Sequence, residues 1–479
     1  METLIDCKKK IKIILLMSGL CFFSLAPSFL TNAMSTYITG AHSVNVVQYA
    51  DLTTNNPDIG KLAEGRRIAL AVSDWSTGKP QRPDWYAPKI KISGKEISGY
   101  FDDCNFVIRV PDKWNGRLVI VGAPGFGDSR STDALISDYV LTKVDKNGAS
   151  YAYAVCDKGT TGEQIPAPDG VIYPWAKAMN AFSNKEDSLS EWNQRFYQLT
   201  MASREVLKKL YNKEPAYTYL LGYSNGGYVT RYAMEHHPEL YSGMIDWEGV
   251  LWRGHEENLI SSLSTAVNAW QILKDQTASP QAKKLAGASL EKMGLPEQSS
   301  MLWPIYGTLY WLPTLNLHRV KYDPEYKNRN WWEFLGHPED YKNYDWFKRP
   351  EAMKRIATIE NTGKITKPTI TIHGTWDALL FPTVHAAAYE KLVEKNGDIR
   401  MYRLYMVEHG NHFDSFVSNP KVDPQNTLQP LMPYVHQAFD ALVNWVENGV
   451  PAPQSMTIGV PESTNKVFSI WDHSEIDMY

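Results

Sequence analysis

The sequence predicts an α/β fold in which helices cover both faces of a mainly parallel β-sheet. Three observations support this prediction. Short β-rich runs alternate with helical patterns between residues 117 and 237. Two more strand-like runs, at residues 368–373 and 401–407, follow a long interruption and resume the alternation. The 479 residues are 43% hydrophobic and 21% charged, a balance typical of a globular chain with a sizeable core.

The expected strands are runs of apolar and β-branched residues that end in turns containing glycine or aspartate. They lie at residues 117–122, 151–156, 217–221, 368–373 and 401–407, the last being the final strand of the sheet. A helix is expected to begin at Ser188, because Glu191 completes a capping box three residues later. Further helices are expected over residues 225–237 and 433–447, and a polar tail follows the second of them.

Residues 1–33 have the features of a secretory signal peptide, and we expect cleavage after Ala33. Four lysines, at positions 8, 9, 10 and 12, precede an apolar stretch from Ile13 to Leu30. Thr31-Asn32-Ala33 then places small residues where signal peptidase requires them. The alternative is a retained membrane anchor, since the apolar stretch approaches the length of a membrane span. Cleavage would leave a secreted or periplasmic protein without stable membrane association.

Two cysteines, Cys104 and Cys156, remain after such a cleavage. An oxidising compartment favours a disulfide, but both residues lie in expected strand regions whose separation the sequence does not reveal. A disulfide and two buried free thiols therefore both stay open.

The strongest chemical signal is Gly222-Tyr223-Ser224-Asn225-Gly226. A serine hydroxyl becomes a nucleophile when a base removes its proton and a sharp turn exposes it, and the flanking glycines permit such a turn. The motif falls between an expected strand and an expected helix, which is the context of the nucleophile elbow in α/β-hydrolases. We therefore expect Ser224 to be the nucleophile of a serine hydrolase.

An oxyanion hole requires two backbone donors near this serine. The first is expected at Asn225, where the helix dipole also favours negative charge. The second is expected from Gly125 or Phe126, in the glycine-containing loop after the strand at 117–122.

The acid and the base should follow the serine in that order along the chain. Asp377 comes shortly after the strand at 368–373, the usual place for the acid. Two histidines compete as the base after the strand at 401–407. We favour His412, because a turn of the form Gly-x-His returns an imidazole over the nucleophile, and we expect His409 to be structural.

Residues 251–360 interrupt the alternation of strands and helices. Seven tryptophans are scattered there among helical stretches and proline-containing turns: Trp252, Trp270, Trp303, Trp311, Trp331, Trp332 and Trp346. We interpret this segment as an inserted helical cap that covers Ser224 and forms most of the substrate pocket, although most of the tryptophans should lie in the cap's own core. The hydrolase core then comprises residues 34–250 and 361–450, and residues 451–479 form a C-terminal tail.

Several segments together resemble a group of secreted serine α/β-hydrolases that includes tannases, feruloyl esterases and 3-hydroxybutyrate oligomer hydrolases. The resembling segments are residues 116–125, 153–162, 222–228, 237–241, 246–249 and 408–412. The resemblance implies a triad of Ser224, Asp377 and His412 and carboxylic esters as substrates. Asp157 and the Asp246-Trp247-Glu248 run also belong to these segments, and we interpret them as loop-shaping.

One departure from this group bears on the substrate. Tannases and fungal feruloyl esterases resemble each other in having cysteines beside the serine and the histidine, joined as a disulfide. Here Tyr223 precedes Ser224 and Asn411 precedes His412. The departure argues against a gallate or ferulate ester and favours oligomeric hydroxyalkanoates or another small ester.

Other classes of function receive less support. The net charge of −4 provides no polybasic surface for nucleic acid. The run from His255 to Leu259 lacks the second histidine of a zinc motif, and no phosphate-binding or dinucleotide-binding loop occurs, so we expect neither metal nor cofactor. An amidase or peptidase would use the same triad, and a non-catalytic binding protein of this fold is the alternative from another class.

Overall fold

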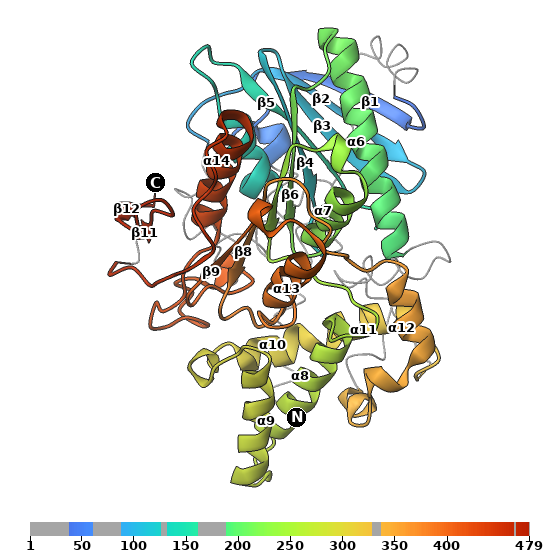
Figure 1. Ribbon diagram of the computed structural model, residues 1–479, viewed down its shortest axis with the longest axis vertical. Helices are drawn as coiled ribbons and strands as arrows, with labels where there is room; N and C mark the ends of the chain where they lie inside the picture. The colour runs from blue at the N-terminus through green and yellow to red at the C-terminus, as the bar shows by residue number, and fades with distance from the viewer. Residues whose placement is uncertain are drawn as a thin grey trace.

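The computed structural model describes residues 38–60, 88–125, 132–160, 188–327, 337–463 and 466–478. In this part of the chain, ten strands form one sheet in the order β1-β2-β3-β5-β4-β6-β7-β8-β9-β10 (Figure 1). The strands are β1 (His42–Tyr49), β2 (Gly94–Phe101), β3 (Cys104–Pro111), β4 (Trp114–Gly122), β5 (Ser150–Cys156), β6 (Tyr217–Tyr223), β7 (Gly243–Trp247), β8 (Thr369–Gly374), β9 (Tyr402–Val407) and β10 (Met456–Ile458).

The sheet is parallel from β5 to β10 and antiparallel at its other end, where β1, β2, β3 and β5 pair in succession. The parallel strands are buried on both faces, as in the run from Leu118 to Val121, where no side chain is exposed. Such strands carry near-continuous apolar runs because both of their faces are covered. This arrangement confirms the expected α/β fold with a mainly parallel sheet.

Besides a helical turn at residues 57–60, ten α-helices accompany the sheet in the described residues. They are α4 (Asp138–Thr142), α6 (Leu189–Tyr211), α7 (Asn225–His236), α8 (Leu259–Lys274), α9 (Pro280–Lys292), α10 (Trp303–Leu309), α11 (Trp311–Tyr322), α12 (Pro350–Ala357), α13 (Ala386–Asn396) and α14 (Met432–Asn448). The hydroxyl of Ser188 accepts a hydrogen bond from the Glu191 amide, so α6 begins where the sequence predicts it.

Helices α7 and α14 cover opposite faces of the sheet. The side chain of Tyr219 on β6 packs against Phe439 and donates a hydrogen bond to Glu447, both on α14. Gly222 on the same strand faces α7, because a Cβ there would lie 2.4 Å from Oγ1 of Thr230. Residues 219 and 222 point to opposite faces, since the side chains of a strand alternate.

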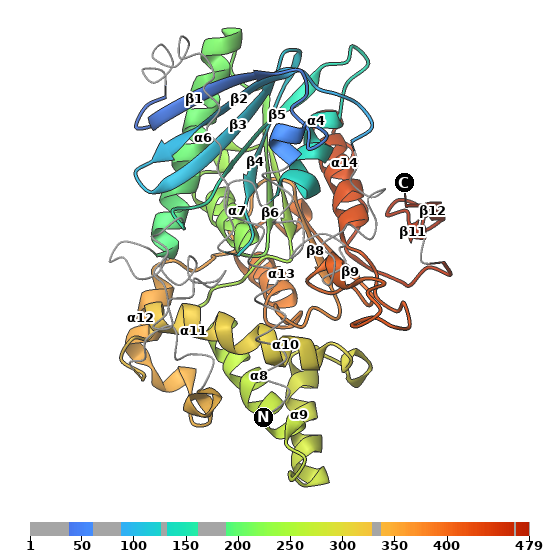
Figure 2. The ribbon, with the colours of Figure 1, turned by 180° about the vertical axis from the view of Figure 1, so that it is seen from behind.

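Helices α8 to α12 lie between β7 and β8 in the chain, and we call them the insertion. Figures 1 and 2 show them gathered at one end of the sheet, in green to orange, away from β1 and β2. Three of its tryptophans, Trp252, Trp311 and Trp346, are almost completely buried, and Trp331 and Trp332 lie outside the described residues.

The structure corrects the sequence predictions at both ends of the sheet. Strand β9 is not the final strand, because β10 pairs with it in parallel. Residues 451–479 are more than a polar tail, since they also contain the antiparallel pair β11 (Lys466–Phe468) and β12 (Glu475–Asp477). Strands of three residues are too short to display the alternation that identifies strands in a sequence. The antiparallel strands β1 to β3 were not predicted either.

The cysteines Cys104 and Cys156 are both buried and free. Of the two options that the sequence left open, the structure therefore contains free thiols. The expected signal peptide, residues 1–33, lies outside the described residues. Among the helices that the structure describes, none is both long and apolar enough to cross a membrane.

Candidate active site

Ser224 lies at a tight turn between β6 and α7. It is the residue before the first turn of α7 and has a left-handed φ of 58° with a ψ of −121°. A Cβ on Gly226 would lie 1.9 Å from the carbonyl oxygen of Gly122, so only glycine allows α7 to approach β4 this closely. The glycines of the motif therefore hold the turn that presents Ser224 at the end of the sheet.

The side chains of Ser224, His412 and Asp377 form one continuous line of polar contacts. Nε2 of His412 lies 3.1 Å from Oγ of Ser224, and Nδ1 of His412 lies 2.9 Å from Oδ2 of Asp377. A carboxylate only accepts, so Nδ1 carries a proton and Nε2 is free to accept the serine proton. All three side chains are buried, with Ser224 the most exposed at 7%. This arrangement is suited to activating a serine nucleophile.

The loop after β8 holds Asp377 in its charged form. Its Oδ1 accepts hydrogen bonds from the amides of Leu379 and Leu380, each 2.8 Å long. Burial by itself would raise the pKa of Asp377, but the nearby imidazole of His412 and these hydrogen bonds outweigh it and lower that pKa below its usual value. Asp377 is therefore an ionised partner for His412 at neutral pH.

His409, the competing histidine, points elsewhere. Its ring stacks on Trp376 with the ring centroids 3.9 Å apart, and its Nδ1 lies 3.1 Å from the carbonyl oxygen of Thr427. The structure thus brings His412, and not His409, to Ser224.

The expected oxyanion donors lie in two places. Asn225 is the first residue of α7 and is buried beside Ser224. Gly125 has a left-handed φ of 51° in the loop after β4, and a Cβ there would meet nothing within 4 Å. Phe126 lies outside the described residues.

Glu248 is a second acidic residue at this site, although its place in the sequence suggested only a loop-shaping role. It follows β7, is completely buried and has a left-handed φ of 48°. Its Oε1 accepts a hydrogen bond from the amide of Gly374, and its Oε2 lies 3.6 Å from Nδ1 of His412. The signal available in the sequence was its position: an acid directly after a strand that neighbours the nucleophile strand. By contrast, Asp246 is structural, because it pairs with Arg231 in the core.

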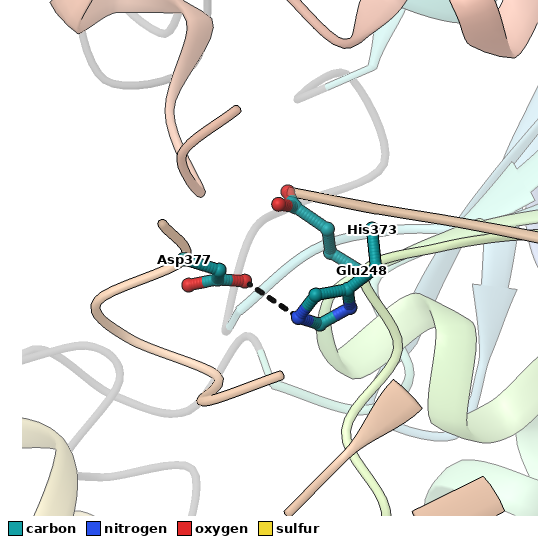
Figure 3. A group of neighbouring side chains, drawn as sticks. All are labelled: Glu248, His373 and Asp377. Atoms are coloured by element: carbon teal, nitrogen blue, oxygen red, sulfur yellow. Dashed lines mark ion pairs between the residues drawn. The ribbon is translucent and has the colours of Figure 1, made fainter. Parts of the chain in front are cut away.

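Glu248, His373 and Asp377 lie close enough to suggest a metal site, and Figure 3 shows their side chains converging. One ligand atom from each lies within 4.8 Å of the others. The donors do not fit a metal ion well. Nε2 of His373 lies 2.8 Å from the carbonyl oxygen of Leu380 and therefore carries a proton, and Oδ2 of Asp377 already accepts from His412. Burial lowers the pKa of His373, which keeps this imidazole neutral.

Two buried residues after β5 shape the neighbouring loop. Asp157 accepts hydrogen bonds from the backbone and side-chain nitrogens of Asn105. Lys158 donates a 2.8 Å hydrogen bond to the carbonyl oxygen of Ala123, at the start of the loop that contains Gly125. Lys158 also has a left-handed φ, of 64°. Four non-glycine residues that follow the parallel strands at this end of the sheet have a left-handed φ: Lys158, Ser224, Glu248 and His409.

Tyr223 links the nucleophile strand to the loop of the base. Its hydroxyl donates a hydrogen bond to the carbonyl oxygen of His412, and its ring stacks on Trp247 with centroids 4.3 Å apart. Neither Ser224 nor His412 has a cysteine beside it in the sequence, so the link between their two segments here is noncovalent.

The insertion contacts both loops that carry Asp377 and His412. Tyr306 on α10 donates a hydrogen bond to Oδ1 of Asn411, the residue before His412. Trp311 on α11 donates a 2.6 Å hydrogen bond to the carbonyl oxygen of Ala378, the residue after Asp377. The insertion therefore lies at the same end of the sheet as Ser224.

Two family models match consecutive parts of the chain. The model described as tannase and feruloyl esterase matches residues 96–278, and the model described as 3HB-oligomer hydrolase matches residues 347–467. A D-(-)-3-hydroxybutyrate oligomer hydrolase from Burkholderia mallei (strain SAVP1) is 37% identical over 113 residues. That alignment covers 22% of this chain and 15% of the relative's length.

Solved structures resemble the whole fold at low sequence identity. The tannin acyl hydrolase from Aspergillus niger has a TM-score of 0.50 and 13% identity, over 92% of this chain and 88% of that one. Feruloyl esterase B from Aspergillus oryzae has a TM-score of 0.48 and 12% identity, over 86% and 88%. The chain thus has the α/β-hydrolase fold and resembles the group of tannases, feruloyl esterases and 3-hydroxybutyrate oligomer hydrolases.

Proposed function

We propose that this protein is a serine hydrolase that cleaves carboxylic esters through an acyl-enzyme intermediate. The observation that carries this proposal is the uninterrupted contact line from Ser224 through His412 to Asp377. A binding protein has no need of a serine, a base and an acid in this geometry. The two matching family models, both of hydrolases or esterases, support the same chemistry.

In the proposed reaction, Nε2 of His412 takes the hydroxyl proton of Ser224 as Oγ forms a bond to the ester carbonyl carbon. Asp377 stabilises the imidazolium that results and keeps the ring oriented. The imidazolium then donates its proton to the leaving alkoxide as the ester C–O bond breaks. Water repeats these steps on the acyl-enzyme, which releases the acid and restores Ser224.

The negative charge on the carbonyl oxygen needs donors during both steps. We assign them to the amide of Asn225 and to an amide of the loop after β4, at Gly125 or Phe126. The close approach of Gly122 to Gly226 supports this assignment, because it brings the start of that loop next to the first turn of α7.

For the substrate, we propose a neutral or weakly charged ester, such as a 3-hydroxybutyrate oligomer or a simple short-chain ester. The match of residues 347–467 to the 3HB-oligomer hydrolase model supports this choice. Tyr223 and Asn411 precede Ser224 and His412, beside which tannases and fungal feruloyl esterases have a cysteine pair. This departure argues against a gallate ester. We expect no nucleic acid partner.

We further propose that residues 34–250 and 361–450 form the catalytic core and that residues 251–360 cap it and provide most of the acyl or alcohol pocket. The contacts of Tyr306 and Trp311 with the two catalytic loops support that position. The lysine-rich and apolar start of the chain supports a secreted or periplasmic location without stable membrane association.

Two measurements test this proposal. A fluorophosphonate probe should label the mature protein, and Ser224→Ala should remove the labelling and reduce ester turnover by roughly 10³-fold or more. A panel of p-nitrophenyl esters, 3-hydroxybutyrate dimers and trimers, methyl gallate, methyl ferulate and aryl amides should show esters and oligomers turned over faster than gallate and amides.

The outcomes separate the alternatives. Fast amide cleavage with negligible ester turnover would indicate an amidase with the same triad. An unlabelled and inactive but folded protein would indicate a binding protein. Labelling that survives Ser224→Ala would show that another residue is the nucleophile.

A further inference from the structure

Two carboxyl groups face the same nitrogen of the base. Oδ2 of Asp377 lies 2.9 Å from Nδ1 of His412, and Oε2 of Glu248 lies 3.6 Å from the same atom. The two acids come from different strands, since Asp377 follows β8 and Glu248 follows β7. Figure 3 shows the carboxyl groups of Glu248 and Asp377 near the imidazole of His373, with a dashed line between Asp377 and His373. One acid would suffice to orient the imidazole, so the second requires an explanation.

The environment of Glu248 permits only one charge on this pair of acids. Both side chains are completely buried, and two carboxylates this close cannot both ionise without a large electrostatic cost. Asp377 has the shorter contact with His412 and two backbone donors, so it holds the charge. Burial, followed by the charges of Asp377 and Asp414, raises the pKa of Glu248 well above its usual value. Glu248 therefore holds its proton more tightly than Asp377 does.

Glu248 is anchored on one side only. The amide of Gly374 donates to its Oε1, while its Oε2, which faces His412, has no hydrogen-bond partner in the described structure. The titratable groups that surround it are Asp377, His412, His373, Asp414, Tyr223 and Tyr306. None of them is a lysine or an arginine that would neutralise an ionised Glu248. Within the part of the chain that the structure describes, the cation that can face its Oε2 is the imidazolium of His412.

We propose that Glu248 is a reserve acid for His412: a positioning residue that takes over the role of Asp377 when the side chain at position 377 cannot ionise, as in Asp377→Asn. In that state Glu248 releases its proton to solvent. A shift of less than 1 Å from the 3.6 Å separation then allows its Oε2 to accept a hydrogen bond from Nδ1 of His412. The left-handed backbone at Glu248, with φ of 48°, places the carboxyl group in this position. The inference rests on the proposed serine hydrolase function.

The test measures the rate of Ser224 labelling by a fluorophosphonate between pH 5 and pH 10, because this rate reports nucleophile activation without knowledge of the substrate. The proteins are the wild type, Asp377→Asn, Glu248→Gln and the double variant. Asparagine keeps the acceptor for the amides of Leu379 and Leu380, so the loop should be retained. Glu235→Gln, combined with Asp377→Asn, is the matched control, since Glu235 is a partly buried acid held by Thr362, Gly363 and Tyr389.

We expect Asp377→Asn to lower the labelling rate by about 10- to 100-fold, well short of the roughly 10⁴-fold loss in kcat known when a triad loses its only acid. The remaining rate should rise with pH as Glu248 ionises. The double variant should lose about 10⁴-fold and show a smaller rise with pH, whereas the Glu235→Gln control should keep the full rise. Glu248→Met, of similar length, replaces Glu248→Gln if the latter does not fold.

A fall of about 10⁴-fold in Asp377→Asn alone, or a rise with pH that is undiminished by the loss of Glu248, would overturn the inference and leave the proposed function intact. A wild-type protein that is not labelled at all would overturn both.

Discussion

The carbonyl oxygen of Gly122 on β4 lies against Gly226 on α7 so closely that a single methyl group would not fit between them. A Cβ at Gly226 would meet that oxygen at 1.9 Å and the Gly122 carbonyl carbon at 2.2 Å. Both contacts are with backbone, which cannot move aside as a flexible side chain can. The position of the nucleophile turn therefore depends on the absence of this one methyl group.

We expect Gly226→Ala to destabilise the protein by at least about 3 kcal/mol and to abolish labelling of Ser224, because α7 must shift away from β4. Urea unfolding and fluorophosphonate labelling measure the two effects. Gly287→Ala is the control: a Cβ at this glycine inside α9 would meet nothing within 4 Å, so the change should stabilise the helix slightly. Equal behaviour of the two variants would contradict the proposed role of the close approach.

The two histidines after β9 should differ sharply in their effect on activity. His412→Ala removes the base and should lower the rate of ester hydrolysis by roughly 10³-fold or more at an unchanged melting temperature. His409→Ala removes a ring that stacks on Trp376, so it should reduce stability by about 1 kcal/mol and leave most activity. Hydrolysis of a p-nitrophenyl ester and thermal unfolding of both variants provide the comparison. A larger loss of activity in His409→Ala would reverse the assignment of the base.

Tyr223→Phe removes the hydroxyl that holds the carbonyl of His412. The loss of one buried hydrogen bond should cost about 1–3 kcal/mol of unfolding free energy. Because the base loop then moves more freely, kcat should fall several-fold while KM changes little. A wild-type kcat in this variant would show that the loop is positioned by its other contacts.

Tyr306→Phe tests whether the insertion supports the base. The variant leaves Oδ1 of Asn411 without the donor that now comes from the insertion. We expect a loss of about 1–3 kcal/mol in stability and a drop in kcat that resembles that of Tyr223→Phe. The control is Tyr326→Phe, which removes a hydrogen bond to Asp340 within residues 323–341, away from the two loops. It should lower stability without lowering kcat.

Asp138 should make stability depend on pH. Burial raises its pKa to about 7, although the hydrogen bonds from Thr54 oppose that shift. The folded protein therefore holds a proton that the unfolded chain has lost, and stability falls as the pH rises from about 4 to about 7. Asp138→Asn keeps an acceptor for Thr54 and removes this titration. Urea unfolding should show the variant gaining stability relative to the wild type between pH 5 and pH 8; a constant difference would contradict the prediction.

The residues that we propose as catalytic could be predicted from the sequence because each of them belongs to a short local pattern. The nucleophile turn requires glycines at fixed spacing, and Asp377 and His412 each follow a recognisable apolar strand. The bounds of β4, β5, β6 and β8 could be predicted to within a few residues for the same reason, since strands buried on both faces are nearly continuous apolar runs.

The features that the sequence did not predict depend on contacts between residues that lie far apart in the chain. Strand β10 has three residues and forms because it pairs with the edge of β9. Glu248 looks like a loop residue in the sequence, and its chemistry arises because β7 lies beside β8, whose following loop carries Asp377. The hydroxyl of Tyr223 donates a hydrogen bond to the carbonyl oxygen of His412, 189 positions later in the chain. No local pattern encodes such pairings.

The four left-handed residues after the parallel strands also bear on how this protein would respond to laboratory selection. Glycine adopts that backbone conformation without strain, whereas other residues pay roughly 1 kcal/mol or more. Lys158, Ser224, Glu248 and His409 are therefore positions where glycine would favour the folded state locally. A library screened for heat resistance alone would accumulate glycines there, and those at Ser224 would yield robust proteins that have lost their nucleophile. Screens for durable variants should therefore require activity at every round.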